Sequence, residues 1–224
     1  MLPSPRRLVL AALLIWPANA ARASALLSPL GIRWGASPQA VQAQLVQAGF
    51  KFDGPNGAAP PDQFLHEQRY EGRVLGLDSD HIAPLFFGGR FFAVVASYSP
   101  TPENPATRIW ETLATKLTAL YGPPASRSKP FQLLSLNAIL SLLPPDTDKS
   151  QLLKFYGAAN KDPEHGKYVL LDLQVETGSW IPEAVWTFAN GATVKAVMRA
   201  GPRTPYGFTN LKPAVIYAWP GELK

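Results

Sequence analysis

The longest stretch of β-branched and aromatic residues covers residues 82–98, and Gly88-Gly89 divides it into two runs. Two such runs separated by two residues that tolerate positive φ are typical of a β-hairpin. Both faces of this hairpin carry apolar side chains, so the pattern predicts strands inside a sheet that is covered on both sides. A two-residue turn also sets the expected pairing: Phe87 with Arg90, Phe86 with Phe91, Leu85 with Phe92, and Ile82 with Val95.

Two amphipathic helices are predicted, one before and one after this hairpin. Ser37 is a suitable N-cap for the first helix, Pro38 takes its first helical position, and Gly49 ends it. This helix is short, so we expect it to pack on the sheet. The second helix begins after Asn104 and Pro105 and has a continuous apolar face, made of Ile109, Leu113, Leu117 and Leu120.

Two strands are expected between the first helix and the hairpin, at residues 64–70 and 73–77, with Glu71-Gly72 as their turn. A helix followed by antiparallel strands therefore occurs twice along the chain. This order hints at a duplicated plan, although no repeat is visible at the level of single residues.

The last third of the chain again has the pattern of β-structure. Residues 168–176 alternate between apolar and polar, which predicts a strand with one face toward the core. Asn190-Gly191 is a strong signal for a two-residue hairpin turn between residues 184–189 and 192–199, and residues 214–219 complete the sheet. The whole pattern predicts one α+β domain, an antiparallel β-sheet with α-helices packed against it.

Residues 130–145 contain no charged side chain and fit a helix that is apolar over most of its surface. A buried helix is the favoured interpretation. A lid, a partner-binding helix and a helix that touches a membrane are the alternatives, and the last usually has a cationic polar face, which this segment lacks.

The N-terminus has the pattern of a bacterial export signal. Arg6 and Arg7 precede an apolar segment at residues 8–16 that is too short to span a bilayer, and Ala18-Asn19-Ala20 provides small residues for cleavage. We expect cleavage after residue 20, with residues 23 and 25 as alternatives, and a mature single domain at residues 26–224 in the periplasm or outside the cell. The sequence has no Cys, so neither a lipoprotein anchor nor a disulfide is expected.

Charge and composition exclude some functions. The formal net charge is +5, and removing residues 1–20 takes away Arg6 and Arg7 and no acidic residue, which leaves +3. The basic residues are scattered rather than interleaved with stacking aromatic residues, so no nucleic-acid partner is expected. No apolar run in the mature chain reaches the length of a transmembrane helix. The sequence does not specify an oligomeric state.

The search for catalytic residues yields none that we assign, and no cofactor is expected. There is no G-x-S-x-G elbow, P-loop or dinucleotide fingerprint. Asp78, Asp80 and His81 are candidate metal ligands in a predicted turn, although no second cluster supplies further ligands. Two pairs of carboxylates, Asp146 with Asp148 and Asp162 with Glu164, lie in predicted polar loops.

One predicted surface combines aromatic and cationic side chains. In a two-residue register for the Asn190-Gly191 hairpin, Trp186 lies across from Lys195, and Phe188 and Arg199 share their face. Such a face suits a sugar, an acidic polymer or a protein partner. Ordinary cross-strand packing, with Lys195 lying over Trp186, is the alternative and is the more common arrangement.

Residues 31–45 have the pattern G-x-x-W-G-x-S-P-x-x-V-x-x-x-L. This pattern resembles the opening helix of small exported bacterial α+β proteins of the β-lactamase-inhibitor-protein type and of the small lipoprotein subunit of the outer-membrane β-barrel assembly machinery. The resemblance implies a short helix on an antiparallel sheet and a role in protein binding. This chain departs from the lipoprotein because it has no Cys to carry a lipid.

The sequence therefore favours an exported, non-catalytic envelope protein that binds a protein or an anionic ligand. Two alternatives stay open. One is an envelope hydrolase that uses loop carboxylates or a metal. The other is a periplasmic protein that contacts lipid through residues 130–145.

Overall fold

An eight-stranded antiparallel sheet forms the centre of the computed structural model, in the order β1-β2-β3-β4-β8-β7-β6-β5. The prediction of an α+β fold with an antiparallel sheet is therefore confirmed. The structure describes residues 25–26, 28–55, 65–129, 135–142, 145, 148–150, 154, 163–176, 181–203 and 209–221. The expected signal peptide lies outside these residues.

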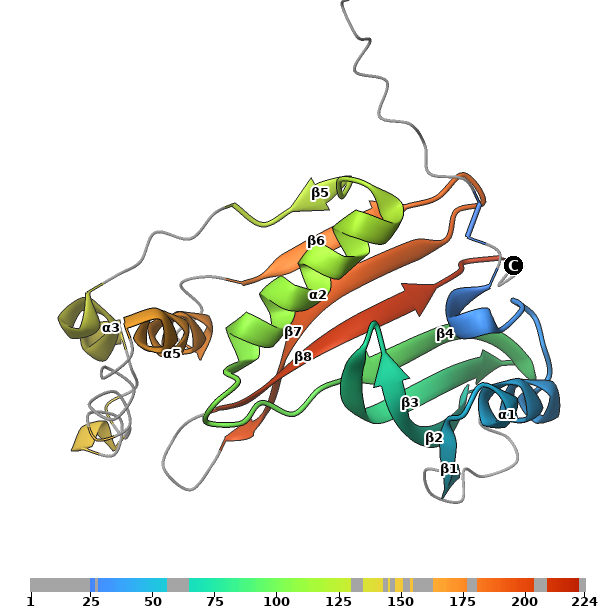
Figure 1. Cartoon of the computed structure of the whole chain (residues 1–224), viewed down its shortest axis with the longest axis horizontal. Helices are drawn as coiled ribbons and strands as arrows, with labels where there is room; N and C mark the ends of the chain where they lie inside the picture. The colour runs from blue at the N-terminus through green and yellow to red at the C-terminus, as the bar shows by residue number, and fades with distance from the viewer. Residues whose placement is uncertain are drawn as a thin grey trace, which may run out of the picture.

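The chain passes through a helix and then four strands, twice in succession (Figure 1). The sheet order is palindromic, so that β4 and β8, the last strands of the two passages, meet in the middle. The duplicated plan that the order of helices and strands suggested is therefore present in the topology of the sheet. The first passage contains α1 (Pro38–Gln47), β1 (Lys51–Pro55), β2 (Leu65–Val74), β3 (Leu77–Phe87) and β4 (Arg90–Ser97). The second contains α2 (Ala106–Tyr121), β5 (Ser126–Arg127), β6 (Glu183–Thr187), β7 (Thr193–Arg203) and β8 (Thr209–Ala218).

Three further elements lie outside these two passages. A 3-10 helix at Pro29–Gly31 precedes α1, while α3 (Leu136–Leu142) and α5 (Pro163–Glu176) lie between β5 and β6. Figure 1 shows α3 and α5 at the end of the sheet away from α1. No helix in the described part of the chain is both long and apolar enough to cross a membrane.

The core lies on the face of the sheet that α1 and α2 cover. Val41 and Leu45 of α1 and Leu113 of α2 are fully buried in one cluster that also contains buried side chains from six strands, β2, β3, β4, β6, β7 and β8. On the opposite face, by contrast, Val95 is only half-buried and Phe87 is 44% exposed. Ala83 and Ala93 on that face are nevertheless only 3% exposed, so the expectation that the central hairpin is covered on both sides holds for these small side chains and not for Phe87.

The central hairpin itself is confirmed, with Gly88 and Gly89 at φ 55° and 72° in its turn. Phe87 pairs with Arg90 and Phe86 with Phe91, as expected, but a β-bulge follows. The extra residue moves every later pair by one position, so the remaining expected pairs are wrong. The observed pairs are Leu85 with Ala93 and Ile82 with Ala96.

The turn before β3 differs from the prediction. Glu71-Gly72 lies inside β2, and the chain turns instead at Leu75 and Gly76, with φ 56° and 71°. A Leu in the left-handed region is rare, so Leu75 is not a recognisable turn signal. Gly72 is required for packing rather than for a turn, because a Cβ at this position would collide with the ring of Phe50.

Residues 168–176, predicted as a strand, belong to α5. Its buried side chains include Tyr168, Leu171 and Gln174, which recur every three residues as on one side of a helix. The predicted strand is therefore wrong.

The two main helices are confirmed, with changes at the start of α2. The Ser37 hydroxyl accepts a hydrogen bond from the backbone N–H of Ala40 at 3.3 Å, as expected of an N-cap. In α2 the N-cap position belongs to Pro105, which has no capping side chain, rather than to Asn104. Leu120, expected on the apolar face, is 61% exposed.

The uncharged segment at 130–145 is helical only over Leu136–Leu142 among its described residues. The side chains described there are exposed or half-buried, and Leu142 is 51% exposed. The prediction of a buried helix is therefore wrong for the described part of this segment.

Candidate functional site

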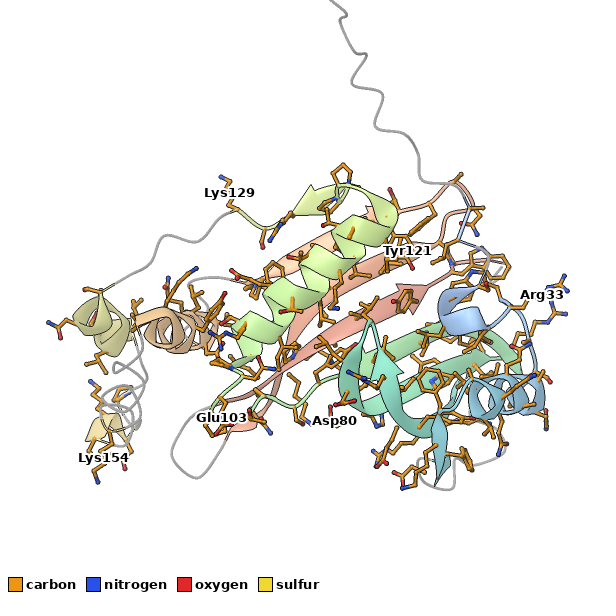
Figure 2. The ribbon with its side chains drawn as sticks, viewed as in Figure 1. Arg33, Asp80, Glu103, Tyr121, Lys129 and Lys154 are labelled. Carbon is orange, nitrogen blue, oxygen red and sulfur yellow. The ribbon has the colours of Figure 1, made fainter. Side chains whose placement is uncertain are left out.

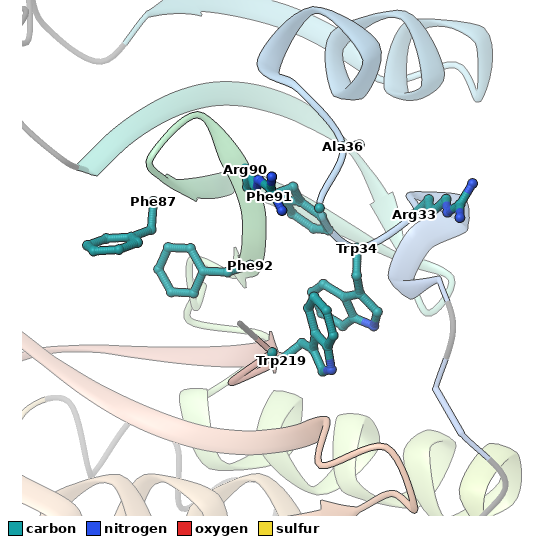
Figure 3. Close-up of a pocket in the computed structure, with 10 residues that line it drawn as sticks. Arg33, Trp34, Ala36, Phe87, Arg90, Phe91, Phe92 and Trp219 are labelled. Carbon is teal, nitrogen blue, oxygen red and sulfur yellow. The ribbon is translucent and has the colours of Figure 1, made fainter. Parts of the chain in front are cut away.

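A pocket of about 420 Å³ lies beside the tip of the central hairpin (Figure 3). Three segments that are far apart in the sequence line it: residues 33–36 before α1, residues 87–92 around the hairpin turn, and residues 219–221 after β8. We call it the hairpin-tip pocket. A volume of this size is typical of a site for a small ligand.

Backbone hydrogen bonds hold the three segments together. The N–H of Gly35 donates to the carbonyl of Phe91, and the N–H of Phe91 donates to the carbonyl of Ala36, both at 2.9 Å. The N–H of Trp219 donates to the carbonyl of Phe92, also at 2.9 Å. The β-bulge at Phe91 and Phe92 thus brings the backbone of β4 to both neighbouring segments. These bonds fix the backbone of the lining independently of any ligand.

Half of the residues that line the pocket are aromatic. Trp34 stacks on Phe91 with ring centroids 5.1 Å apart and on Trp219 at 6.1 Å. Figure 3 shows Phe87 and Phe92 together on the other side of the pocket from the two indoles. Trp34, Trp219 and Phe92 are half-buried, so each keeps part of its surface accessible.

The two indole N–H groups are already bonded to backbone carbonyls. Trp34 Nε1 donates to the carbonyl of Leu26 at 2.7 Å, and Trp219 Nε1 donates to that of Asn190 at 3.2 Å. The Asn190 side chain donates in turn to the Leu26 carbonyl at 2.9 Å. These bonds fix the ring orientations, and they leave the ring faces rather than the N–H groups to contact a ligand.

Two arginines, Arg33 and Arg90, supply the charge of the pocket. Both are exposed, and Figure 2 shows Arg33 projecting from the edge of the molecule. The described residues that line the pocket include no Asp or Glu. The described lining is therefore aromatic and cationic.

The predicted aromatic and cationic surface on β6 and β7 is not formed. Trp186 and Phe188 are 2% and 7% exposed and belong to the core. Trp186 pairs with Val194, while Lys195 pairs with Val185, so Trp186 and Lys195 lie on opposite faces of the sheet. Trp186 Nε1 donates to the carbonyl of Gly122 at 2.8 Å.

The register differs because the hairpin loop is longer than two residues. The N–H of Phe188 donates to the carbonyl of Ala192 at 3.0 Å, and Gly191 has φ 78°. Three residues, rather than Asn190 and Gly191 alone, therefore make the connection, as in a type I turn followed by a bulge. A shift of one residue moves every side chain to the other face.

The two cations of that prediction lie on the face opposite the core. Lys195 forms an ion pair with Glu183 at 3.9 Å, and Arg199 is exposed on the same strand. The combination of aromatic and cationic side chains does occur, but at the hairpin-tip pocket. The sequence offered no spacing signal for that pocket, because Trp34 and Trp219 come from opposite ends of the described chain.

The candidate metal ligands also have other roles. Asp78, Asp80 and His81 lie in strand β3 rather than in a turn. Asp78 pairs with Arg73 at 3.1 Å, and Asp80 pairs with Lys212 at 3.3 Å and accepts a hydrogen bond from the Ser99 hydroxyl at 2.7 Å. Within the described ranges, no group of three or more His, Asp or Glu is placed to hold a metal ion.

Comparison of the chain with protein-family models, with curated proteins and with solved structures gave no match. The interpretation of the hairpin-tip pocket therefore depends on its geometry and chemistry.

Proposed function

We propose that this chain is an exported, non-catalytic envelope protein that binds a ligand or a partner segment in the hairpin-tip pocket. The observation that carries this proposal is a rigid pocket lined by stacked aromatic rings and two arginines. Preformed concave sites with an apolar lining and a few convergent polar groups are the usual form of a ligand site.

The side chains of the pocket favour binding over catalysis. The charged side chains in its described lining are those of Arg33 and Arg90, and a guanidinium donates hydrogen bonds without accepting any. A general base must accept a proton and a nucleophile must donate an electron pair, and the described side chains of this lining offer neither. The described carboxylates Asp78 and Asp80 are held in ion pairs away from this lining, which does not favour the hydrolase alternative.

Removal of a signal peptide would leave the contacts that organise the pocket intact. Leu26, whose carbonyl accepts hydrogen bonds from Trp34 and Asn190, lies beyond all three expected cleavage positions. Cleavage after residue 20, 23 or 25 therefore leaves these bonds in place. The mature product is proposed as a single domain at residues 26–224.

Photo-crosslinking in intact cells tests the proposal. A photoreactive phenylalanine analogue at Phe87, which is 44% exposed at the pocket, should form an adduct with whatever occupies the site. The same analogue at Val46, which is 51% exposed on α1, is the matched control. An adduct at position 87 that is absent at position 46 supports the proposal. Equal labelling at both positions, or none at position 87, would overturn it.

A second candidate is contact with lipid through the segment at 130–145. The segment has no charged residue, and Leu142 on α3 is 51% exposed, so an apolar side chain of this segment is available to a lipid surface. Co-sedimentation with liposomes, compared between the native chain and a Leu142→Ser variant, tests it. Sedimentation that does not change with the substitution, or no sedimentation at all, removes this candidate.

A further inference from the structure

Leu26 lies at the centre of the hydrogen bonds that organise the hairpin-tip pocket. Its backbone carbonyl accepts from Trp34 Nε1 at 2.7 Å and from the Asn190 side chain at 2.9 Å. The carbonyl of Asn190 accepts in turn from Trp219 Nε1 at 3.2 Å. A single carbonyl ahead of α1 therefore positions both indoles of the pocket, one directly and the other through Asn190.

The segment that carries Leu26 is joined lightly to the fold, and we call it the N-terminal latch. The Leu26 side chain is 9% exposed and belongs to the core cluster, whereas Ala25 and Ser28 beside it are exposed. Firmer anchoring begins after the latch, with Pro29 buried and Ile32 fully buried. The gain from two hydrogen bonds and one buried leucine is similar in size to the entropy lost when a few residues become ordered. The latch can therefore detach while the rest of the fold stays intact.

The 3-10 helix that follows the latch has a strained backbone. Leu30 has φ 52° and ψ 25°, in the left-handed region that a leucine rarely adopts. Strain of this kind persists only where the surrounding structure imposes it. Because the docked latch leads directly into this helix, detachment would let Leu30 relax, which brings the docked and detached forms closer in free energy.

Detachment of the latch would change the pocket. Trp34 Nε1 and Asn190 Nδ2 would both lose their acceptor, and a half-buried donor without a partner is costly, so both side chains would turn toward water. Asn190 would then no longer hold its carbonyl against Trp219. The stack of Trp34 on Trp219, with ring centroids 6.1 Å apart, would loosen as a result.

We infer that the N-terminal latch regulates the hairpin-tip pocket. With Leu26 docked at Trp34 and Asn190, the pocket is held in its binding form, and detachment of the latch loosens the aromatic stack and releases the occupant. This inference rests on the proposed function, since it names the regulation of the same site. Because linkage is reciprocal, an occupant that binds only the docked form also holds the latch in place.

Hydrogen exchange of the indole N–H groups in a ¹⁵N-labelled sample tests whether the latch detaches. Those of Trp34 and Trp219 should exchange by local opening, at a rate that does not change with urea below the unfolding transition, because little surface is exposed. Trp110 and Trp186 are 2% exposed and donate to carbonyls in the core, so their exchange should accelerate with urea. Exchange of all four indoles at one urea-dependent rate would overturn the inference.

Two variants loosen the latch without replacing a residue of the pocket lining. Asn190→Asp keeps an oxygen that can accept from the Ala192 N–H at 3.3 Å, but it replaces the donor to Leu26 with an anionic oxygen. Leu26→Asp places a charge where the latch enters the core. Asn210→Asp makes the same change at an exposed asparagine of β8, at the end of that strand away from the pocket, and is the matched control.

The indole resonances report the effect of these variants. Each latch variant should raise the population of the detached form about tenfold, the ratio that one lost hydrogen bond supplies. The resonances of Trp34 and Trp219 should therefore move toward the position of a free indole, while those of Trp110 and Trp186 stay in place. Resonances in Asn190→Asp that match those in the control variant would overturn the inference.

Photo-crosslinking at position 87 connects the latch to binding. The yield of the adduct should fall several-fold when Asn190→Asp is added and should stay unchanged with Asn210→Asp. An unchanged yield in Asn190→Asp, together with shifted resonances of Trp34 and Trp219, would overturn the regulatory inference and leave the proposed function standing. The absence of a specific adduct in the native chain would overturn the proposed function instead, so the two failures can be told apart.

Discussion

Asp172 on α5 caps Thr107 at the start of α2. Its carboxylate accepts hydrogen bonds from the backbone N–H groups of Ala106 at 2.9 Å and Thr107 at 2.8 Å. The Thr107 hydroxyl donates in turn to the carbonyl of Tyr168 at 3.2 Å. Pro105, at the N-cap of α2, has no side-chain acceptor, so a distant helix provides the cap that the local sequence lacks.

Removing this cap should destabilise the fold. Asp172→Ala is expected to lower the free energy of unfolding by about 1–2 kcal/mol, because it removes two acceptors and a negative charge from the positive end of the α2 dipole. Asp172→Asn should cost less, since one acceptor oxygen remains. Urea denaturation of the three proteins measures the differences.

A control for the cap is available on β3. Asp78 has a side chain that is 88% exposed, and it pairs with the exposed Arg73. Asp78→Ala should therefore change the free energy of unfolding by no more than about 0.5 kcal/mol. If Asp172→Ala were as mild as Asp78→Ala, the carboxylate of Asp172 would not be a structural cap.

The Asp172 cap also shows why part of the fold could not be read from the sequence. The alternation at residues 168–176 predicted a strand, yet tertiary packing makes it a helix whose Tyr168 and Asp172 contact the first turn of α2. Alternation over a short segment fits both structures, and the deciding contacts come from residues more than 60 positions away. By contrast, α1, α2 and the Gly88-Gly89 turn depend on local signals, and these were predicted correctly.

The candidate site depended on register, which local signals did not determine. Two hairpins were located correctly, but a bulge at Phe91 and Phe92 and a longer loop at Asn190 each shifted the pairing by one residue. The bulge allows Phe91 and Phe92 to bond with Gly35, Ala36 and Trp219, which are distant in the chain. The types of side chain expected at a binding site were present in the sequence, but their meeting at one pocket was not visible there.

The position of Trp186 can be tested by its effect on stability. Trp186 is 2% exposed, and its indole donates to the Gly122 carbonyl, so Trp186→Ala should lower the free energy of unfolding by about 3–5 kcal/mol. Lys195→Ala removes a partly exposed side chain on the other face and should cost no more than about 0.5 kcal/mol. Thermal or urea denaturation checks both. Small losses for both variants would instead support the solvent-facing register expected from the sequence.

The turn of the central hairpin provides a test of backbone conformation. Gly88 has φ 55°, and a Cβ built there meets no atom within 4 Å, so backbone strain rather than space opposes a side chain. Gly88→Val should lower the free energy of unfolding by about 1–2 kcal/mol, whereas Gly88→Asn should cost much less because Asn-Gly suits this type of turn. Chemical denaturation measures the pair of variants. Equal losses for Val and Asn would contradict a left-handed conformation at this position.

Buried tyrosines should make the protein sensitive to alkaline pH. Burial raises the pKa of Tyr70 to about 12, and burial together with the nearby charge of Asp80 raises the pKa of Tyr98 still further. Burial likewise raises the pKa of Tyr217 well above its ordinary value. In the unfolded chain these phenols begin to lose their protons near pH 10, while in the folded protein they keep them.

Stability should therefore be insensitive to these groups below about pH 9 and should decrease as the pH rises from about 10 to 12. Over that range a deeply buried phenol such as that of Tyr217 lowers the free energy of unfolding by up to about 1.4 kcal/mol per pH unit, because the unfolded state releases a proton that the folded state retains. The hydroxyl of Tyr70 is only partly buried and should contribute less. Urea denaturation at a series of alkaline pH values measures the slope, and tyrosinate absorbance reports ionisation. Tyr98→Phe removes a hydrogen bond to the Val74 carbonyl, so it should lower the free energy of unfolding at neutral pH. It also removes one ionisable phenol, so the free energy of unfolding should decrease less steeply with pH above pH 10. A native protein whose stability stays constant up to about pH 12 would show that these phenols ionise as freely in the fold as in the unfolded chain.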